Sequence, residues 1–163
     1  MADPVSIRTI RHGVLKIKDG GANSLTIPVD RGELTWTVSQ EVHVIRNRQT
    51  LHSFVKGLNQ PMDLSFSCVF QEWKGQGAGG ADPSPADALL KLGNASAWAS
   101  TSSNTSLYTV NLEFTISGNQ DEDEVLSFSP FAMESADFAE AADGNTLSFS
   151  GKALMETPTS TRS

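Results

Sequence analysis

The sequence has a single cysteine and few positively charged side chains. Cys68 is the only cysteine, so no intramolecular disulfide can form and a thiolate zinc cluster is excluded. The 19 acidic side chains outnumber the 12 basic ones, and the net charge of −7 opposes the phosphate attraction on which DNA-binding surfaces depend. Stability must therefore come from packing or from oligomerisation, and a conventional nucleic-acid-binding protein is disfavoured.

Long apolar runs and catalytic spacings are missing as well. No run of about 18 apolar residues occurs, and the N-terminus lacks a basic region followed by an apolar one, so we expect a protein with no membrane anchor and no signal peptide. His12, His43 and His52 belong to no HExxH pair or ligand cluster. No GxSxG motif supports a serine nucleophile. We therefore expect no enzymatic activity, no metal and no cofactor.

Two segments resemble ligand-binding loops only superficially. The glycine-rich stretch 75–80 has neither the GxxxxGK[ST] ending nor the GxGxxG spacing of a phosphate loop. The acidic run 121–124 lacks the spaced ligands and the glycine of an EF-hand. The first is interpreted as a flexible loop and the second as a solvated hairpin tip. Cys68 and Trp98 are expected to be buried in the core.

Alternation of apolar and polar residues is the main positive signal. A period of two predicts half-buried β-strands. Three long strands would place on their apolar faces Leu34, Trp36, Val38, Val42 and Val44; then Met62, Leu64, Phe66, Cys68 and Phe70; then Tyr108, Val110, Leu112, Phe114 and Ile116. Shorter strands are predicted at 14–18, 24–29, 50–55, 125–129 and 147–155. Turn residues between them favour antiparallel hairpins.

One short helix interrupts this pattern. Ser84 is a suitable N-cap, Pro85 suits the first helical position, and Asp87 follows the cap by three residues. Gly93 is expected to end the helix. Residues 157–163 are interpreted as a frayed tail. The whole chain, 1–163, is thus predicted to be a single, mostly antiparallel β domain with one helix.

The faces of the long strands opposite the core contain neither Lys nor Arg. They carry Thr35, Thr37, Ser39, Glu41 and His43; Asp63, Ser65, Ser67 and Gln71; and Thr109, Asn111, Glu113 and Thr115. A channel wall that passes DNA without holding it needs this character, because each added cation increases DNA affinity. An ordinary polar sheet face of an acidic protein would have the same composition, so the pattern alone leaves both interpretations open.

The order of these features resembles the tail tube proteins of bacteriophages, also called major tail proteins. The segments that carry the resemblance are 32–36 (GELTW), 46–49 (RNRQ), 61–66 (PMDLSF), 87–90 (DALL), 97–98 (AW) and 144–152 (GNTLSFSGK). Together they span most of the chain.

The resemblance implies two packed antiparallel sheets, as a sandwich or partly open barrel, flanked by one short α-helix. It also implies hexameric rings that stack into a tube in the virion tail, with DNA only in transit through the lumen. Residues 46–60 are the best match for an element that bridges rings, with Arg46, Arg48 and Lys56 as stacking candidates. The residues expected to line the lumen are Thr35, Ser39, Ser65, Ser67, Asn111 and Glu113.

Further expectations follow from the same resemblance. The partners would be copies of the chain itself and the tape-measure, tail terminator and baseplate proteins, and synthesis would occur in the host cytoplasm. Residues 1–12 would form a flexible N-terminal arm. Two alternatives stay open: a ligand-binding β-sandwich for sugars or adhesion, with Trp73 or Trp98 as an exposed stacking platform, and, with less support, a serine hydrolase.

Overall fold

The computed structural model describes residues 13–27, 34–69, 83–100, 108–117, 123–140 and 144–162. Their elements are, in chain order, β1 (Gly13–Lys18), β2 (Ser24–Ile27), β3 (Thr35–Thr37), β4 (Gln40–Asn47), β5 (Thr50–Asn59), β6 (Met62–Val69), α1 (Pro85–Leu90), the 3-10 helix η2 (Gly93–Ala95), β7 (Thr109–Ile116), β8 (Glu124–Ala139), β9 (Thr146–Ala153) and β10 (Thr159–Arg162). The expected class, mainly β with two antiparallel sheets and one short α-helix, is confirmed.

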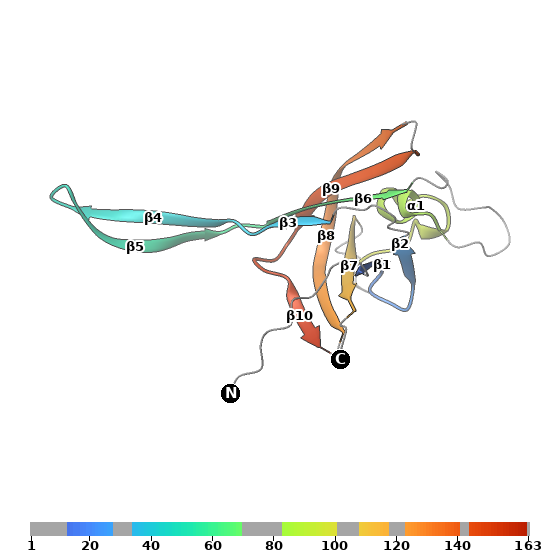
Figure 1. Cartoon of the computed structure of the whole chain (residues 1–163), viewed down its shortest axis with the longest axis horizontal. Coiled ribbons are helices and arrows are strands. Elements are labelled where there is room, and N and C mark those ends of the chain that lie inside the picture. Colours follow the sequence, from blue (N-terminus) through green and yellow to red (C-terminus); the bar gives the residue numbers. More distant parts are fainter. Residues whose placement is uncertain are drawn as a thin grey trace.

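Most of the described strands belong to one antiparallel sheet. Its order is β2-β1-β7-β8-β9-β6-β3, and β10 pairs with β8 beside this path. The sheet is not closed, because its end strands β2 and β3 do not pair with each other. The second sheet consists of β4 and β5 alone, which project from the rest of the molecule (Figure 1). We call the large sheet with its helix the body, and the β4–β5 hairpin the arm.

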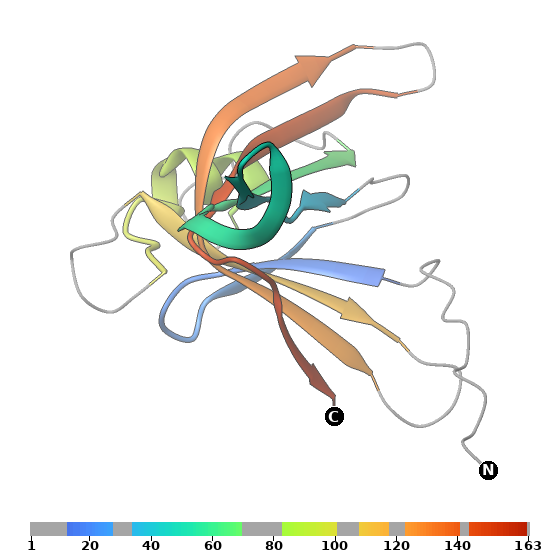
Figure 2. The ribbon, with the colours of Figure 1, turned by 90° about the vertical axis from the view of Figure 1, so that its left-hand side faces the viewer.

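Strand β8 connects the two halves of the body. Its first residues pair with β7 and β10, and its later residues pair with β9. Register shifts between Val110 and Leu112 of β7 and between Met133 and Ser135 of β8 mark irregularities where such a strand can bend. Figure 2 shows the two halves diverging along β8.

Aromatic contacts show that the sheet curls around its core. Strand β3 is three strands away from β8, which corresponds to about 14 Å in a flat sheet. The rings of Trp36 on β3 and Phe128 on β8 nevertheless lie 5.6 Å apart, measured between centroids. Phe66 of β6 contacts both Phe131 and Phe149. The body is therefore a partly open barrel, one of the two forms that we expected.

The predicted alternation is confirmed in β6, β7 and β9. In each of these strands, every second residue is buried. Cys68 lies in this core as expected, its thiol donates to the Leu147 carbonyl at 3.6 Å, and burial raises its pKa to about 11. Trp98 is buried too, so it is a core anchor.

Helix α1 begins as the sequence predicts. The Ser84 hydroxyl accepts from the Asp87 amide, and Asp87 accepts from the Ser84 amide, both at 3.1 Å, which forms a capping box. The helix ends earlier than expected, because Lys91 adopts the left-handed conformation two residues before Gly93. The Lys91 ammonium donates to the Trp98 carbonyl at 2.6 Å, and burial lowers its pKa to about 8.

Several strand boundaries differ from the prediction. The long strand expected from Leu34 to Val44 is two strands, β3 and β4, which belong to different sheets. The segment expected at 125–129 is the start of the 16-residue β8. The tail expected to be frayed contains β10, whose Thr159 to Arg162 pair with β8. The predicted N-terminal arm 1–12, the glycine-rich stretch 75–80 and Trp73 lie outside the described residues.

Candidate functional site

The arm continues the β3–β6 edge of the body. Strands β3 and β6 pair with each other, and β4 and β5 pair beyond them, so one long hairpin runs out of the sheet. The short segments 38–39 and 60–61 separate the two parts. Pro61 has no backbone N–H to donate to a ladder, which accounts for an interruption on the β6 side. Figure 1 shows the arm standing clear of the body on both sides.

The tip of the arm is a tight turn between Asn47 and Thr50. Arg48 and Gln49 both have positive φ, 45° and 70°. Two consecutive positive φ values are typical of a type I′ turn, whose twist matches that of a two-stranded ribbon. Such turns favour Asn and Gly, so non-glycine residues here accept some strain. Arg48 therefore lies in the turn at the tip of the arm.

Exposed apolar side chains cover both faces of the arm. Val44 pairs with Phe54, and Val42 lies two residues from Val44, so these three share one face. His43 pairs with Val55, which places Val55 and Ile45 on the opposite face. Phe54 is 73% exposed and Leu58 is 76% exposed. A surface of this kind normally binds a partner, because an isolated two-stranded hairpin has no core of its own.

The base of the arm is held by polar contacts. The Leu58 amide donates to Glu41 Oε2 at 2.9 Å, and His43 Nε2 lies 3.3 Å from Glu41 Oε1. Glu41 crosses over Gly57, where a Cβ would lie 2.6 Å from that carboxylate. Lys56 Nζ lies 2.7 Å from Glu156 Oε2, between β9 and β10. The Glu41 contacts join the two strands of the arm, and the Lys56–Glu156 ion pair is the contact that joins the arm to the segment between β9 and β10.

A second candidate surface is the face of the body sheet turned away from the core. Hydroxyl groups from neighbouring strands line up there. Thr35 Oγ1 lies 2.6 Å from Ser65 Oγ, Ser65 pairs with Ser150, and Ser150 Oγ lies 2.7 Å from Ser135 Oγ. The row therefore crosses β3, β6, β9 and β8. A parallel row contains Ser67, Ser148 and Asp137. Both rows consist of neutral or acidic groups, and in the first row the hydroxyls form two hydrogen-bonded pairs.

The cations on this face lie beside carboxylates. Lys152 of β9 lies 3.4 Å from both Asp63 and Glu134, and these two carboxylates raise the pKa of its ammonium. On the other half of the sheet, Lys18 Nζ lies 2.7 Å from Glu113 Oε2. The polar faces predicted for the three long strands contain no lysine, because Lys18 and Lys152 come from β1 and β9. The assembled face therefore contains lysine: Lys18 and Lys152 are paired with carboxylates, and Lys16, on the same face of β1 as Lys18, lies opposite Glu113 in the β1–β7 register.

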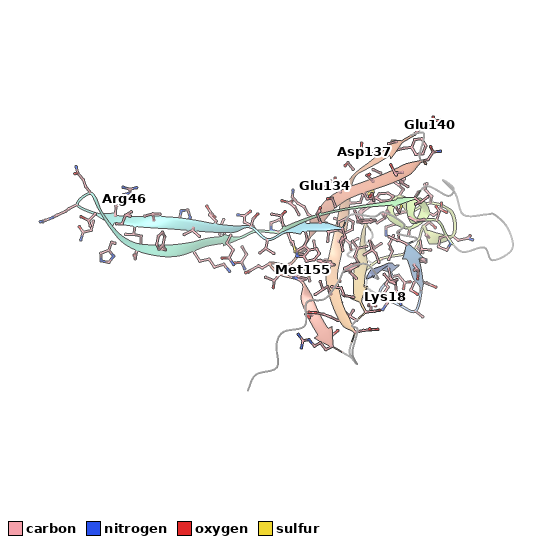
Figure 3. The ribbon with its side chains drawn as sticks, in the orientation of Figure 1. Lys18, Arg46, Glu134, Asp137, Glu140 and Met155 are labelled. Atoms are coloured by element: carbon pink, nitrogen blue, oxygen red, sulfur yellow. The ribbon has the colours of Figure 1, made fainter. Side chains whose placement is uncertain are left out.

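The predicted site residues fall into separate groups. Arg46 and Arg48 lie at the tip of the arm, as Figure 3 shows for Arg46, whereas Lys56 lies near its base in the ion pair with Glu156. Among the lumen candidates, Thr35, Ser65 and Ser67 lie together on β3 and β6, and Asn111 and Glu113 lie together on β7. Ser39 lies between β3 and β4.

Asn111 has an evident structural role. Its side-chain amide donates to the carbonyls of Asp19 at 3.3 Å and Ser100 at 3.1 Å. The Ser129 hydroxyl donates to its carbonyl oxygen. Asn111 thus connects the β1–β2 turn, the loop before β7 and strand β8.

Sequence reasoning missed the apolar surface of the arm. Val38, Val42 and Val44 were assigned to a half-buried strand, and this expectation is wrong because all three are exposed. Tyr108, predicted on the apolar face of the third long strand, is also exposed and precedes β7. One signal was available: residues 40–59 carry apolar side chains on both strand faces, a pattern that a one-sided sheet does not need.

The described residues offer little support for the alternative sites. Trp98 is buried and cannot serve as an exposed stacking platform. His43 and His52 both lie on the arm, and within the described ranges no three His, Cys, Asp or Glu residues are grouped to hold a metal ion. No helix in the described part of the chain is long and apolar enough to cross a membrane.

The chain thus folds as a partly open antiparallel barrel with a projecting hairpin arm. It is similar to a chain in the cryo-EM structure of the anti-feeding prophage baseplate, which was sixfold symmetrised. The TM-score is 0.50, the sequence identity is 11%, and the match covers 100% of this chain and 97% of that chain. No protein-family model and no curated protein sequence matches. The structural likeness establishes a shared fold.

Proposed function

We propose that this chain is a structural, non-enzymatic subunit of a phage-tail-like particle, and that it assembles with copies of itself into stacked hexameric rings. The stacked rings would form a tail tube through which DNA passes. Tape-measure, tail terminator and baseplate proteins are its expected partners. The protein would be made in the host cytoplasm and would reside in the virion tail.

The arm carries this proposal. Its apolar side chains lie on both faces of a two-stranded ribbon, so the body of the same copy cannot cover them. Burial of a side chain such as Phe54 or Leu58 against another molecule contributes roughly 1.5–3 kcal/mol. A protein that functions as a monomer would risk aggregation by exposing these apolar side chains. An assembly buries them in a defined contact between rings.

The fold likeness supports the same proposal. The similar chain comes from a baseplate structure to which sixfold symmetry was applied, and the match extends over the whole length of this chain. The open ends of the body sheet add a physical argument. Among the described residues the edge strands β2, β3 and β10 pair on one side only, and pairing between neighbouring subunits would satisfy their other edges in a closed ring.

The polar sheet face is the proposed lumen wall. Its hydroxyl rows around Thr35, Ser65 and Ser67 bring no net positive charge, and Lys18 and Lys152 are neutralised by neighbouring carboxylates. DNA affinity depends on uncompensated cations. A wall of this kind would let DNA pass with little retention. Asn111 and Glu113 extend the same face onto β7.

Electron microscopy of concentrated protein tests the proposal. We expect rings or tubes, either with the protein alone or after addition of the other tail components as an initiator. A species that stays monomeric in sedimentation velocity with those components present would contradict the proposal. Quenching of tryptophan fluorescence by glycans, without particles and without dependence on protein concentration, would favour a ligand-binding β-sandwich instead.

A further inference from the structure

The arm has two apolar faces, and each of them is exposed in the single copy. Val42, Val44 and Phe54 share one side of the ribbon, which we call the Phe54 face. Ile45 and Val55 share the other side, which we call the Val55 face. All five side chains are between 45% and 73% exposed. One partner surface covers only one face of a ribbon, so burial of both faces requires contacts on two sides.

A ring supplies an equivalent neighbour on each side of every arm. In the proposed ring all copies are related by rotation, so neighbouring arms stand at the same height and at the same distance from the axis. Figure 1 shows the arm standing clear of its own body. The Phe54 face of one arm can therefore meet the Val55 face of the next. Such a contact joins two different surfaces, and it closes when the rotation completes a ring.

The side chains at the level of Phe54 suit this contact. Arms at the same height bring the Phe54 ring of one copy to the level of Ser53 and Val55 of the next copy, because these two residues flank position 54 on the opposite face. Ile45, which pairs with Ser53, and Val55 offer aliphatic contacts to the ring. Ser53 has a small side chain, which projects less than its apolar neighbours. The most exposed aromatic ring of the arm thus meets an apolar surface with a low point.

The charges at the base of the arm are complementary between the two faces. Lys56 pairs with Val42 and lies on the Phe54 face. Glu41 lies on the Val55 face, where a Cβ on Gly57 would lie 2.6 Å from its side chain. Neighbouring arms therefore bring an ammonium group and a carboxylate to the same level. Lys56 also contacts Glu156 of its own copy, but an ammonium group has three donors and a carboxylate accepts several hydrogen bonds.

The tip of the arm is compatible with a neighbouring tip. Arg46 lies two residues beyond Val44 and therefore on the Phe54 face, whereas Asn47 and Thr50 pair with each other on the Val55 face. The next arm thus offers neutral oxygen atoms as acceptors to the Arg46 guanidinium. Packed sheets lie about 10 Å apart. The Debye length at physiological ionic strength is about 8 Å, so repulsion between arginines of adjacent tips is largely screened.

We propose that each arm is held between the arms of its two neighbours in the ring. Its Phe54 face lies against the Val55 face of one neighbour, and its Val55 face lies against the Phe54 face of the other. The packed arms form a sleeve that projects from one ring toward the next. This inference rests on the proposed self-assembly into rings and names the partner of each face of the arm.

Cross-linking tests which faces meet. The double variant Val42→Cys, Val55→Cys carries one thiol on each face, and these two thiols point to opposite sides of the same copy. Treatment of the assembled variant with a short bismaleimide should give a ladder of covalent oligomers on a denaturing gel. The ladder should end at the hexamer, because the linked arms close into a ring. Cys68 is buried and should not react.

A pair of thiols on one face provides the matched control. In an assembled mixture of Val42→Cys copies and Val44→Cys copies, every added thiol lies on the Phe54 face, and we expect no linked copies. Links in this mixture would show that like faces meet and would overturn the inference. Tubes of the double variant that give no ladder, or a ladder that continues beyond the hexamer, would overturn it as well.

Substitutions on the two faces test whether both are buried. Val44→Asp on the Phe54 face and Val55→Asp on the Val55 face each place a carboxylate in an apolar contact. Each should raise the critical concentration for assembly at least about tenfold, with the folded body retained in circular dichroism. Asn59→Asp, at an exposed position at the base of the arm, should assemble as the unmodified protein does.

The outcomes separate this inference from the proposed function. An effect of only one of the two valine substitutions would mean that the arm docks by a single face, which contradicts packing between two neighbouring arms. An unmodified chain that never forms rings or tubes would contradict the proposed function itself, and the packing of the arms with it.

Discussion

The body and the arm are built from the same kind of strand but bury their side chains differently. Met62 at the start of β6 is fully buried, whereas Leu58 near the end of β5, four residues earlier, is 76% exposed. The body sheet curls so that its apolar face meets itself across the core. Within the described ranges the arm has two strands and no second layer, so its apolar side chains stay exposed in the single copy.

This difference separates folding from assembly. Side chains in the body should determine whether the subunit is stable, and side chains in the arm should determine whether subunits associate. Variants that affect only one of these properties therefore test the division between the two regions.

Removing the arm should have the largest effect. When a two-residue Asn-Gly turn replaces residues 40–59, β3 and β6 stay connected as a hairpin, and the body keeps its core. We expect complete loss of tubes with a cooperative thermal unfolding transition retained. Electron microscopy and circular dichroism measure these two properties. Normal tube formation without the arm would show that the arm is not the bridging element.

Core and arm phenylalanines should respond in opposite ways. Phe128 is fully buried against Trp36, so Phe128→Ala should lower the free energy of unfolding by about 3–5 kcal/mol. Phe54→Ala, at an exposed position on the arm, should change it by no more than about 0.5 kcal/mol while weakening assembly. Urea denaturation of both variants makes the comparison. A large loss of stability from Phe54→Ala would mean that the arm is part of the core.

Two glycines provide a comparison at the backbone. A Cβ on Gly151 of β9 would lie 2.1 Å from the Ala132 carbonyl oxygen and 2.9 Å from Met133 Cα, and backbone atoms cannot easily yield. Gly151→Ala should therefore lower the free energy of unfolding by about 1–3 kcal/mol. The three atoms nearest to a Cβ on Gly57 of the arm all belong to the flexible side chain of Glu41. Gly57→Ala should lower the free energy of unfolding by less than about 1 kcal/mol. Urea denaturation measures both variants, and equal losses of stability would contradict this difference.

The ion pair at the base of the arm should have the smallest effect. Lys56 and Glu156 are 2.7 Å apart, but both side chains are substantially exposed. Lys56→Gln and Glu156→Gln should show a coupling free energy below about 0.5 kcal/mol in a double-mutant cycle. A coupling free energy above about 2 kcal/mol would indicate that the Lys56–Glu156 pair, and not the strand connection, holds the arm in place.

Much of the fold follows from local sequence signals. The alternation in β6, β7 and β9 identifies both the strands and their buried faces, because a single buried layer imposes a period of two. The start of α1 is equally local, since Ser84, Pro85 and Asp87 complete a capping box within four residues. The candidate site could be predicted only in part from the sequence. Arg46 and Arg48 are among the predicted bridging candidates, but the sequence pattern places the apolar side chains beside them in the core.

The sequence by itself determined that this chain is a β protein with one capped helix, because strand alternation and helix capping act over a few neighbouring residues. Only the tertiary structure decided which strands face a core. Leu34 to Val44 show one continuous alternation, yet β3 pairs with β6 in the body and β4 pairs with β5 in the arm. Burial depends on a second layer supplied by distant residues, and in the arm no described residue of the same copy supplies one.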